Sequence, residues 1–276
     1  MRTFALVGPG RAGSSLALAL LARGWRAVAV TGRSADARST RAAVARLGCP
    51  PAEAAVAGRG AALVVVATPD AAIDAVAAAL APGLEPGALV VHCSGARGLD
   101  ALACVHAARP DVEIGALHPL QTLAAADPAP LVGAWAAVAG PLAVTELALE
   151  LGLRPFVVPD DRRAAYHAAA VVASNHVVAL LGQVARIAAV AGVPVDAFWP
   201  LIDTTIANVE ARGVADALTG PVARGDLATV AAHLDAIGPA ERDAYAGLAL
   251  AALALTGRED PSLRELFIGV RGEVPA

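Results

Sequence analysis

The stretch TFALVGPGRAGS, residues 3–14, decides the fold of this chain. Its apolar start predicts a buried strand, its glycines a tight turn, and the alanine- and leucine-rich residues over 12–22 a helix. Gly8, Gly10 and Gly13 form a GxGxxG pattern, in which successive glycines permit the turn, the approach of a pyrophosphate and close helix–strand packing. Because the helix N-terminus offers free N–H groups to phosphates, the stretch predicts dinucleotide binding.

Short β-rich runs and alanine-rich helical stretches alternate up to residue 159, and only helices are expected after it. Continuous apolar runs without alternation predict a parallel sheet covered on both faces. We therefore expect an α/β fold, with a Rossmann-type, mostly parallel sheet domain over residues 1–159 and an all-α substrate and dimerisation domain over 160–276, which opens with one long helix. The expected strands span residues 4–7, 27–30, 62–67, 88–91, 113–117, 134–139 and 155–158; the expected helices include 71–81, 196–212, 227–237, 239–255 and 261–270.

The hydropathy of the chain comes from small side chains. The 276 residues are 57% hydrophobic but only 3% aromatic, and 72 of them are alanine. The longest suspect stretch, residues 168–181, holds Ser174, Asn175 and His176 and is shorter than the roughly 20 residues of a membrane span. The N-terminal residues enter the strand pattern directly, which leaves no room for a signal peptide. We therefore expect a cytoplasmic protein without membrane contact.

The charged residues exclude some partners and constrain the chemistry. A net charge of −4 offers no broad cationic surface for nucleic acid. Three cysteines without a CxxC pair argue against disulfides and structural zinc, so no metal site is expected. All 21 basic residues are arginine, and this composition, rich in alanine, glycine and arginine without lysine, is typical of a GC-rich bacterial genome.

The end of the second strand selects the dinucleotide. NAD-binding folds usually place an acid there, whereas this chain continues Thr31-Gly32-Arg33-Ser34. An arginine and a hydroxyl suit the 2′-phosphate of NADP(H), although a surface arginine in a turn would look the same. Thr68 and Pro69 follow the third strand, and Ser94 and Gly95 follow the fourth. These two turns either lie along the ribose and nicotinamide or have no role beyond turning the chain. The expected cofactor-binding residues are Gly8, Pro9, Gly10, Arg11, Ala12, Gly13, Arg33, Ser34, Thr68, Pro69, Ser94 and Gly95.

His118, in the run HPLQT of residues 118–122, follows a predicted strand. At the end of a strand it can donate a hydrogen bond to a carbonyl or bind a carboxylate, with Gln121 and Thr122 as partners. A structural histidine is the alternative. Nothing in the residues alone decides between them.

Two further runs carry polar side chains at spacings that suit a site. On the long helix, His167, Ser174 and Asn175 lie on one stripe with valines, and need a ligand or an interhelical hydrogen bond as partner if buried. In LTGPVARGD, residues 218–226, Arg224 can clamp a substrate carboxylate, unless the run is a plain interhelical turn. We expect His118, His167 and Asn175 to be catalytic, and Gln121, Ser174 and Arg224 to bind substrate.

Four runs together resemble a known family: GPGRAGSSL at 8–16, HPLQT at 118–122, YHAAAVVASN at 166–175 and LTGPVARGD at 218–226. The chain resembles bacterial proteins that join a Rossmann-like NADP-binding domain to a C-terminal helical domain of unknown function. They belong to the wider 6-phosphogluconate dehydrogenase-like, β-hydroxyacid dehydrogenase and ketopantoate reductase group. The resemblance implies a long helix that lines the cleft and supports a homodimer. It also implies a catalytic lysine four residues before Asn175, where this chain has Val171.

The expected function follows from the motifs and the resemblance. We expect an NADP(H)-dependent oxidoreductase that reduces a small carboxylate-bearing 2-oxo acid, such as ketopantoate, or a related imine. Without lysine, His118 or His167 has to supply the proton for the forming alkoxide, unless water does. One alternative is a non-catalytic NADP(H)-binding sensor or scaffold, which the missing lysine favours. Another is a dehydrogenase or decarboxylating enzyme acting on a cyclic substrate, suggested by the His-Pro pair.

Overall fold

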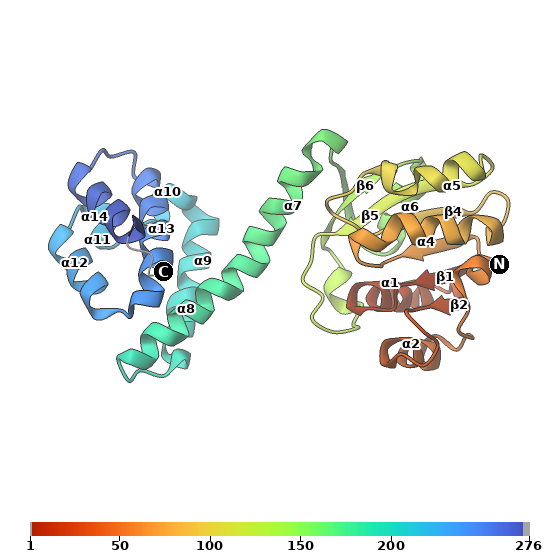
Figure 1. Ribbon diagram of the computed structural model, residues 1–276, viewed down its shortest axis with the longest axis horizontal. Helices are drawn as coiled ribbons and strands as arrows, with labels where there is room; N and C mark the ends of the chain where they lie inside the picture. The colour runs from red at the N-terminus through yellow and green to blue at the C-terminus, as the bar shows by residue number, and fades with distance from the viewer. Residues whose placement is uncertain (1, 273–276) are drawn as a thin grey trace. The chain divides into compact units, whose positions relative to one another are not determined.

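The structure is a computed structural model that describes residues 2–272 (Figure 1). Its contacts divide the chain into two compact units, between Ser174 and Asn175. Strands end at Val157, whereas the compact units divide later, inside the long helix. The expected domain boundary at residue 159 stays a prediction. The two units are described separately below.

The first unit is built on one seven-stranded sheet with the order β2-β1-β3-β4-β5-β6-β7. All neighbouring strands are parallel except β5 and β6, which are antiparallel, so the expectation of a mostly parallel sheet is confirmed. The strands are β1 Thr3–Val7, β2 Arg26–Thr31, β3 Leu63–Val66, β4 Leu89–His92, β5 Glu113–Pro119, β6 Trp135–Ala139 and β7 Arg154–Val157.

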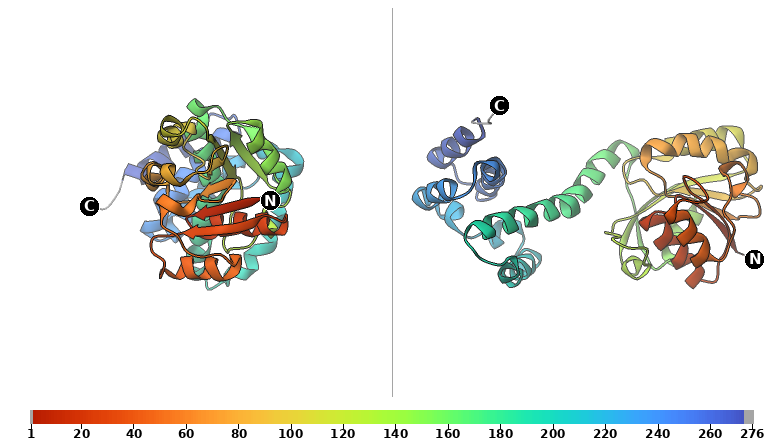
Figure 2. Two further views of the ribbon diagram at one scale, coloured as in Figure 1. Left: turned by 90° about the vertical axis from the view of Figure 1, so that its right-hand side faces the viewer. Right: turned by 60° about the horizontal axis from the view of Figure 1, so that its bottom comes forward.

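Helices cover both faces of this sheet, as Figure 2 shows. Successive residues of a strand point to opposite faces, so Phe4 and Leu6 join one buried cluster while Ala5 and Val7 join the other. The first cluster also contains buried residues of α1 (Arg11–Ala22), α2 (Arg38–Leu47) and α6 (Leu142–Glu150). The second cluster contains buried residues of α3 (Ala54–Ala57), α4 (Ile73–Leu80) and α5 (Ala103–Ala108). Short 3-10 turns span Asp70–Ala72, Ala81–Gly83, Leu99–Leu102 and Ala129–Leu131.

The strand register places the carboxyl ends of four parallel strands at one edge of the sheet. Val7 pairs with Val66, Val66 with His92, and His92 with Ala116. The segments that follow β1, β3 and β4 therefore start side by side. His118 lies two residues further along β5 at the same edge, where open α/β sheets bind ligands.

The long helix after β7 is continuous from Asp160 to Val190, which confirms the expected helix of about this length. It consists of a 3-10 turn (Asp160–Arg162), α7 (Arg163–Val171), a π-helical turn (Val172–His176) and α8 (Val177–Val190). With 31 residues and a hydropathy of 1.6 over its most apolar window, it is long and apolar enough to cross a membrane. Excluding a span by length was therefore wrong, because the helix extends beyond residues 168–181 at both ends. The cytoplasmic location stays a prediction.

The second unit contains helices only within the residues that the structure describes. After α8 and a 3-10 turn (Val195–Phe198), its helices are α9 Trp199–Arg212, α10 Val214–Ala217, α11 Pro221–Arg224, α12 Leu227–Ala236, α13 Pro239–Leu255 and α14 Pro261–Gly272. A core of eight buried residues from α12 to α14, among them Leu234 and Phe267, holds these three helices together. Asp226 caps α12 as expected, since its carboxylate accepts from the N–H of Thr229 at 3.1 Å.

Candidate functional site

The glycine turn after β1 has room for backbone only at Gly8 and Gly13. Gly8 has φ +90°, and a Cβ there would lie 2.5 Å from the carbonyl carbon of Ala67. A Cβ on Gly13 would overlap the carbonyl oxygen of Gly8, so helix and turn touch directly. At Gly10 the Cβ position has nothing within 4 Å, which leaves open space in front of the first turn of α1. The turn therefore has the features that a bound pyrophosphate needs.

A hydroxyl without a partner lies beside this turn. Thr68 follows β3, and its backbone nitrogen lies 2.7 Å from the Cβ position of Gly8. The Thr68 Oγ1 atom is buried and has no hydrogen-bond partner among the described residues. A buried polar atom of this kind normally has a partner, so Thr68 is suited to hydrogen-bond a ligand held by the glycine turn.

The turn after β2 leaves two polar side chains in solvent. Arg33 and Ser34 are exposed, and Arg33 makes no ion pair within residues 2–272. The turn itself is fixed, because Thr31 Oγ1 donates to the carbonyl oxygen of Ala52 at 2.9 Å and Gly32 packs directly against Thr40. Arg33 is therefore an exposed cation without an ion-pair partner within residues 2–272, on a turn that is itself held in place.

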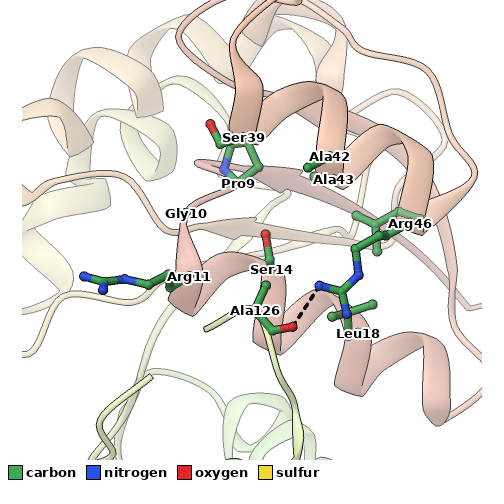
Figure 3. A pocket seen from close by; sticks show the side chains of 11 residues that line it. Pro9, Gly10, Arg11, Ser14, Leu18, Ser39, Ala42, Ala43, Arg46 and Ala126 are labelled. Carbon is green, nitrogen blue, oxygen red and sulfur yellow. Dashed lines mark hydrogen bonds between the residues drawn. The ribbon is translucent and has the colours of Figure 1, made fainter. Parts of the chain in front are cut away.

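A cavity of about 260 Å³ lies between α1 and α2, next to the glycine turn (Figure 3). The side chain of Arg46 donates to the carbonyl oxygen of Ala126 at 2.8 Å, while that of Arg11 points away from the cavity. Ser15 Oγ accepts from the N–H of Asp127 at 3.1 Å. The loop after β5 is thereby fastened to α1 and α2.

The turn after β4 is rigid because its polar groups bond to one another. Ser94 Oγ donates to Asp70 Oδ2 at 2.8 Å and accepts from the N–H groups of Ala96 and Arg97 at 3.2 and 3.0 Å. His92 is fully buried; its Nε2 donates to the carbonyl oxygen of Gly98 at 2.9 Å, and its Nδ1 accepts from the N–H of Ser94 at 3.2 Å. Burial lowers the pKa of His92, which keeps it neutral.

His118 and the long helix meet at this turn. His118 Nδ1 lies 2.7 Å from the hydroxyl oxygen of Tyr166, with the two rings edge to face at 5.6 Å between centroids. The His167 ring lies 5.8 Å from that of His118. A Cβ on Gly95 would lie 2.7 Å from His167 Nδ1 and 2.9 Å from His118 Nε2. Both imidazoles therefore lie against the backbone at Gly95, which only glycine permits.

The surroundings keep His118 neutral at physiological pH. Burial, the largest cause, together with the charges of His167 and Arg163 lowers its pKa to about 4. Burial raises the pKa of Tyr166, while Arg163 opposes that rise. With a neutral imidazole, a Tyr166 hydroxyl that donates to Nδ1 leaves the proton of His118 on Nε2. The pair then presents an N–H donor beside Gly95.

The helix face in this unit differs from the expected stripe. Arg163, Tyr166, His167 and Ser174 are its buried or half-buried polar residues. The π-helical turn inserts an extra residue and so rotates the face beyond residue 172. The stripe through Asn175 and Val178 was therefore wrong. Tyr166 was missed as a site residue, although it directly precedes His167 in the sequence.

The remaining expected residues belong to other segments of the two units. Ser174 Oγ lies 3.0 Å from Thr122 Oγ1, and Gln121 is exposed, with its Nε2 donating to the carbonyl oxygen of Pro130 at 3.2 Å. Asn175 and Arg224 are exposed residues of the second unit. Arg224 ends the short helix α11, where a glycine-bounded loop was expected, because Pro221 starts a helical turn. No group of three or more metal-ligating side chains is found among the described residues.

Family models match most of the chain. A model described as a Rossmann-like domain matches residues 3–119, and one described as a domain of unknown function, DUF2520, matches residues 132–252. No curated protein matches the chain.

Solved structures share the fold over nearly the whole chain. A candidate NADP oxidoreductase from Bacteroides fragilis is 23% identical with a TM-score of 0.77, over 92% of this chain and 98% of that one. The protein TM1727 from Thermotoga maritima is 25% identical, with a TM-score of 0.63 over 99% and 98%. An imine reductase from Myxococcus stipitatus in complex with NADP⁺ is 18% identical, with a TM-score of 0.62 over 97% and 100%. The two family models show that this chain has a Rossmann-like domain followed by a DUF2520 domain, and the solved structures share its fold.

Proposed function

We propose that this protein is an NADP(H)-dependent oxidoreductase that reduces the C=O or C=N bond of a small substrate. The observation that carries the proposal is the His118–Tyr166 hydrogen bond of 2.7 Å, at the edge of the sheet that also holds the glycine turn. Proteins of the same fold that are described as imine reductases and as a reductive aminase support the reaction class.

The residues of the cofactor site themselves fit a dinucleotide. The glycine turn would hold the pyrophosphate, the unpartnered Thr68 hydroxyl would bond to the ligand, and Arg33 with Ser34 would bind a 2′-phosphate. A reduced nicotinamide, when bound, supplies a hydride. The other expected cofactor residues keep their predicted roles, except that the Ser94 hydroxyl is already occupied by protein partners.

The His118–Tyr166 pair supplies the proton that the reduction also requires. When the substrate carbon gains a hydride, its oxygen or nitrogen gains electron density and needs a proton. His118 gives up its Nε2 proton and receives the Tyr166 proton on Nδ1, so one N–H and one O–H bond break while two new ones form. The negative charge ends on the Tyr166 oxygen until solvent restores the proton. This relay replaces the lysine that the chain lacks.

The substrate class is the finer part of the proposal. We expect a 2-oxo acid of the ketopantoate kind, or a related imine, with Gln121, Ser174 and Arg224 as candidate substrate-binding residues. His167, whose buried Nδ1 has no partner among the described residues, is a second candidate to contact substrate. The catalytic role of Asn175 stays a prediction.

Turnover with defined substrates tests the function. A panel of 2-oxo acids and cyclic imines is incubated with NADPH, and loss of the reduced-nicotinamide absorbance is followed. The proposal predicts turnover with at least one member, and a His118→Asn variant that binds NADPH normally but turns over at least 100-fold more slowly. Tight NADPH binding without turnover across the panel would instead support the sensor, which the missing lysine favours. Activity only with NADP⁺ and a cyclic alcohol or acid would support the dehydrogenase.

A further inference from the structure

Arg163 is a buried cation whose hydrogen-bonding capacity is mostly unused. Its side chain is 1% exposed, and its Nε donates to Asp160 Oδ1 at 3.0 Å. The Nη1 and Nη2 atoms are buried and have no partner among the described residues. Since buried guanidinium groups normally use all their donors, this one requires a physical explanation.

Its one ion-pair partner compensates the charge incompletely. The carboxylate of Asp160 is 61% exposed, so water weakens its field without abolishing it, while the guanidinium is shielded from solvent. A net positive potential therefore acts on the groups that lie beside Arg163 in the interior of the first unit.

Those groups are the proton relay. Tyr166 and His167 follow Arg163 by three and four residues, which places all three on one face of α7. Tyr166 bonds to His118 of β5. The other titratable groups whose charges act on this pair are His92 of β4 and Asp70 of the turn after β3. The charge of Arg163 lowers the pKa of both Tyr166 and His118, whereas burial raises that of Tyr166.

We infer that Arg163 is a positioning residue that supplies the fixed positive charge opposite the phenolate formed when Tyr166 passes its proton to His118. The inference rests on the relay proposed above. In that relay the Tyr166 O–H bond breaks, a His118 Nδ1–H bond forms, and the tyrosine oxygen becomes negative inside the protein. Arginine suits this role because it stays charged when buried, whereas a lysine in the same place readily loses its proton.

The pKa of Tyr166 in the free protein measures this effect directly. The chain has two tyrosines, so a Tyr245→Phe background leaves Tyr166 as the only one that titrates. Its ionisation is read as tyrosinate absorbance after a rapid pH jump, before alkaline unfolding, and the pKa of His118 is read by NMR. Arg163→Gln should raise both values, that of Tyr166 by about one pH unit or more.

The direction of the change separates charge from packing. If Arg163 only fills space, its loss admits water, and the pKa of Tyr166 then falls because burial no longer raises it. An unchanged or lower Tyr166 pKa in Arg163→Gln would overturn the inference. The control Arg162→Gln, at an exposed neighbour, should leave both values unchanged. A shift there as large as in Arg163→Gln would also overturn it.

A second variant covers the case in which Arg163→Gln does not fold. Asp160→Asn removes the exposed carboxylate and leaves the guanidinium without its ion-pair partner, so the pKa of Tyr166 should fall. No change or a rise would contradict the inference. Because these are equilibria of the free protein, a correct set of shifts without any turnover would refute the proposed function and leave the electrostatic role of Arg163 standing.

Discussion

At the scale of single residues, charge and burial decide the chemistry of this protein. His118 is neutral because burial and the charges of His167 and Arg163 lower its pKa, and the Tyr166 hydroxyl lies 2.7 Å from its Nδ1. Arg33, by contrast, is exposed at the end of β2 and makes no ion pair with the described residues. Two predictions belong to this scale.

The first concerns the pH dependence of stability. The folded-state pKa of His118 is lowered to about 4 from an ordinary 6.5, so its stabilising contribution is complete above pH 6.5 and is lost as pH falls toward 4. The midpoint of thermal unfolding should therefore fall less for His118→Asn than for the wild type as the pH drops from 6.5 to 4. Part of the fall that remains comes from His92, whose pKa is also lowered by burial. The control His106→Asn, at an exposed histidine, should follow the wild type. Identical pH profiles for wild type and His118→Asn would contradict the assignment.

The second concerns cofactor choice. Arg33→Ala should weaken NADPH binding by about 10- to 100-fold, the value of a charge-assisted hydrogen bond, and barely change NADH binding. Titration calorimetry with both cofactors measures this. Arg59→Ala, an exposed arginine after α3, is the matched control and should change neither affinity. Equal losses for the two cofactors in Arg33→Ala would remove Arg33 from the 2′-phosphate site.

At the scale of elements, turns at the carboxyl ends of the strands bring the groups together. The glycine turn after β1, the Thr68 turn after β3 and the bonded turn after β4 start side by side because the strand register aligns their ends. The histidine of β5 lies at the same edge. One glycine in these turns has a specific consequence.

Gly95→Ala should displace the two imidazoles while leaving the cofactor turn intact. The new Cβ would lie within 3 Å of both the His118 and the His167 rings, which have to shift. We expect a fall in kcat of at least tenfold at saturating NADPH, measured by steady-state kinetics. Gly10→Ala is the counterpart, since its Cβ points into open space, and should weaken NADPH binding without unfolding the protein. A fully active Gly95→Ala enzyme would argue against His118 as the proton donor.

The strands were predictable because each is a short, continuous apolar run between turn signals, and all seven lie within two residues of the expected positions. Helices α2, α3, α5 and α6 of the first unit were not predicted, since alanine occurs throughout the chain and blurs their boundaries.

The central contact of the candidate site was not predictable either. A pairing such as His118 with Tyr166 joins residues 48 apart and depends on how the long helix meets the sheet. Sequence periodicity contains no signal for such a contact.

At the scale of the whole molecule, the second unit exposes several large apolar side chains. Val178 of α8 and Leu201 and Ile206 of α9 are 69%, 63% and 52% exposed. Monomeric proteins rarely expose so many large apolar side chains on neighbouring helices. We propose that they pack against a second copy of the chain, as expected for a homodimer through the helical domain.

Sedimentation velocity tests that proposal. The wild type should sediment as a dimer at micromolar concentration, and Leu201→Asp should sediment as a monomer, because burying an unpaired carboxylate in an apolar interface is unfavourable. Leu149→Asp, at a leucine of α6 that is 58% exposed, is the control and should remain dimeric. A wild-type protein that stays monomeric at all concentrations would eliminate the dimer.

The relay itself is tested most directly by the turnover of Tyr166→Phe. This change removes one oxygen atom and keeps the ring, which packs against that of Phe156 with 5.7 Å between the ring centroids. With the best substrate of the panel and saturating NADPH, single-turnover rates are compared for wild type, Tyr166→Phe and Tyr245→Phe. The account predicts that Tyr166→Phe is at least 100-fold slower with an unchanged Kd for NADPH, and that Tyr245→Phe is as fast as wild type. A Tyr166→Phe rate equal to the wild-type rate would contradict it.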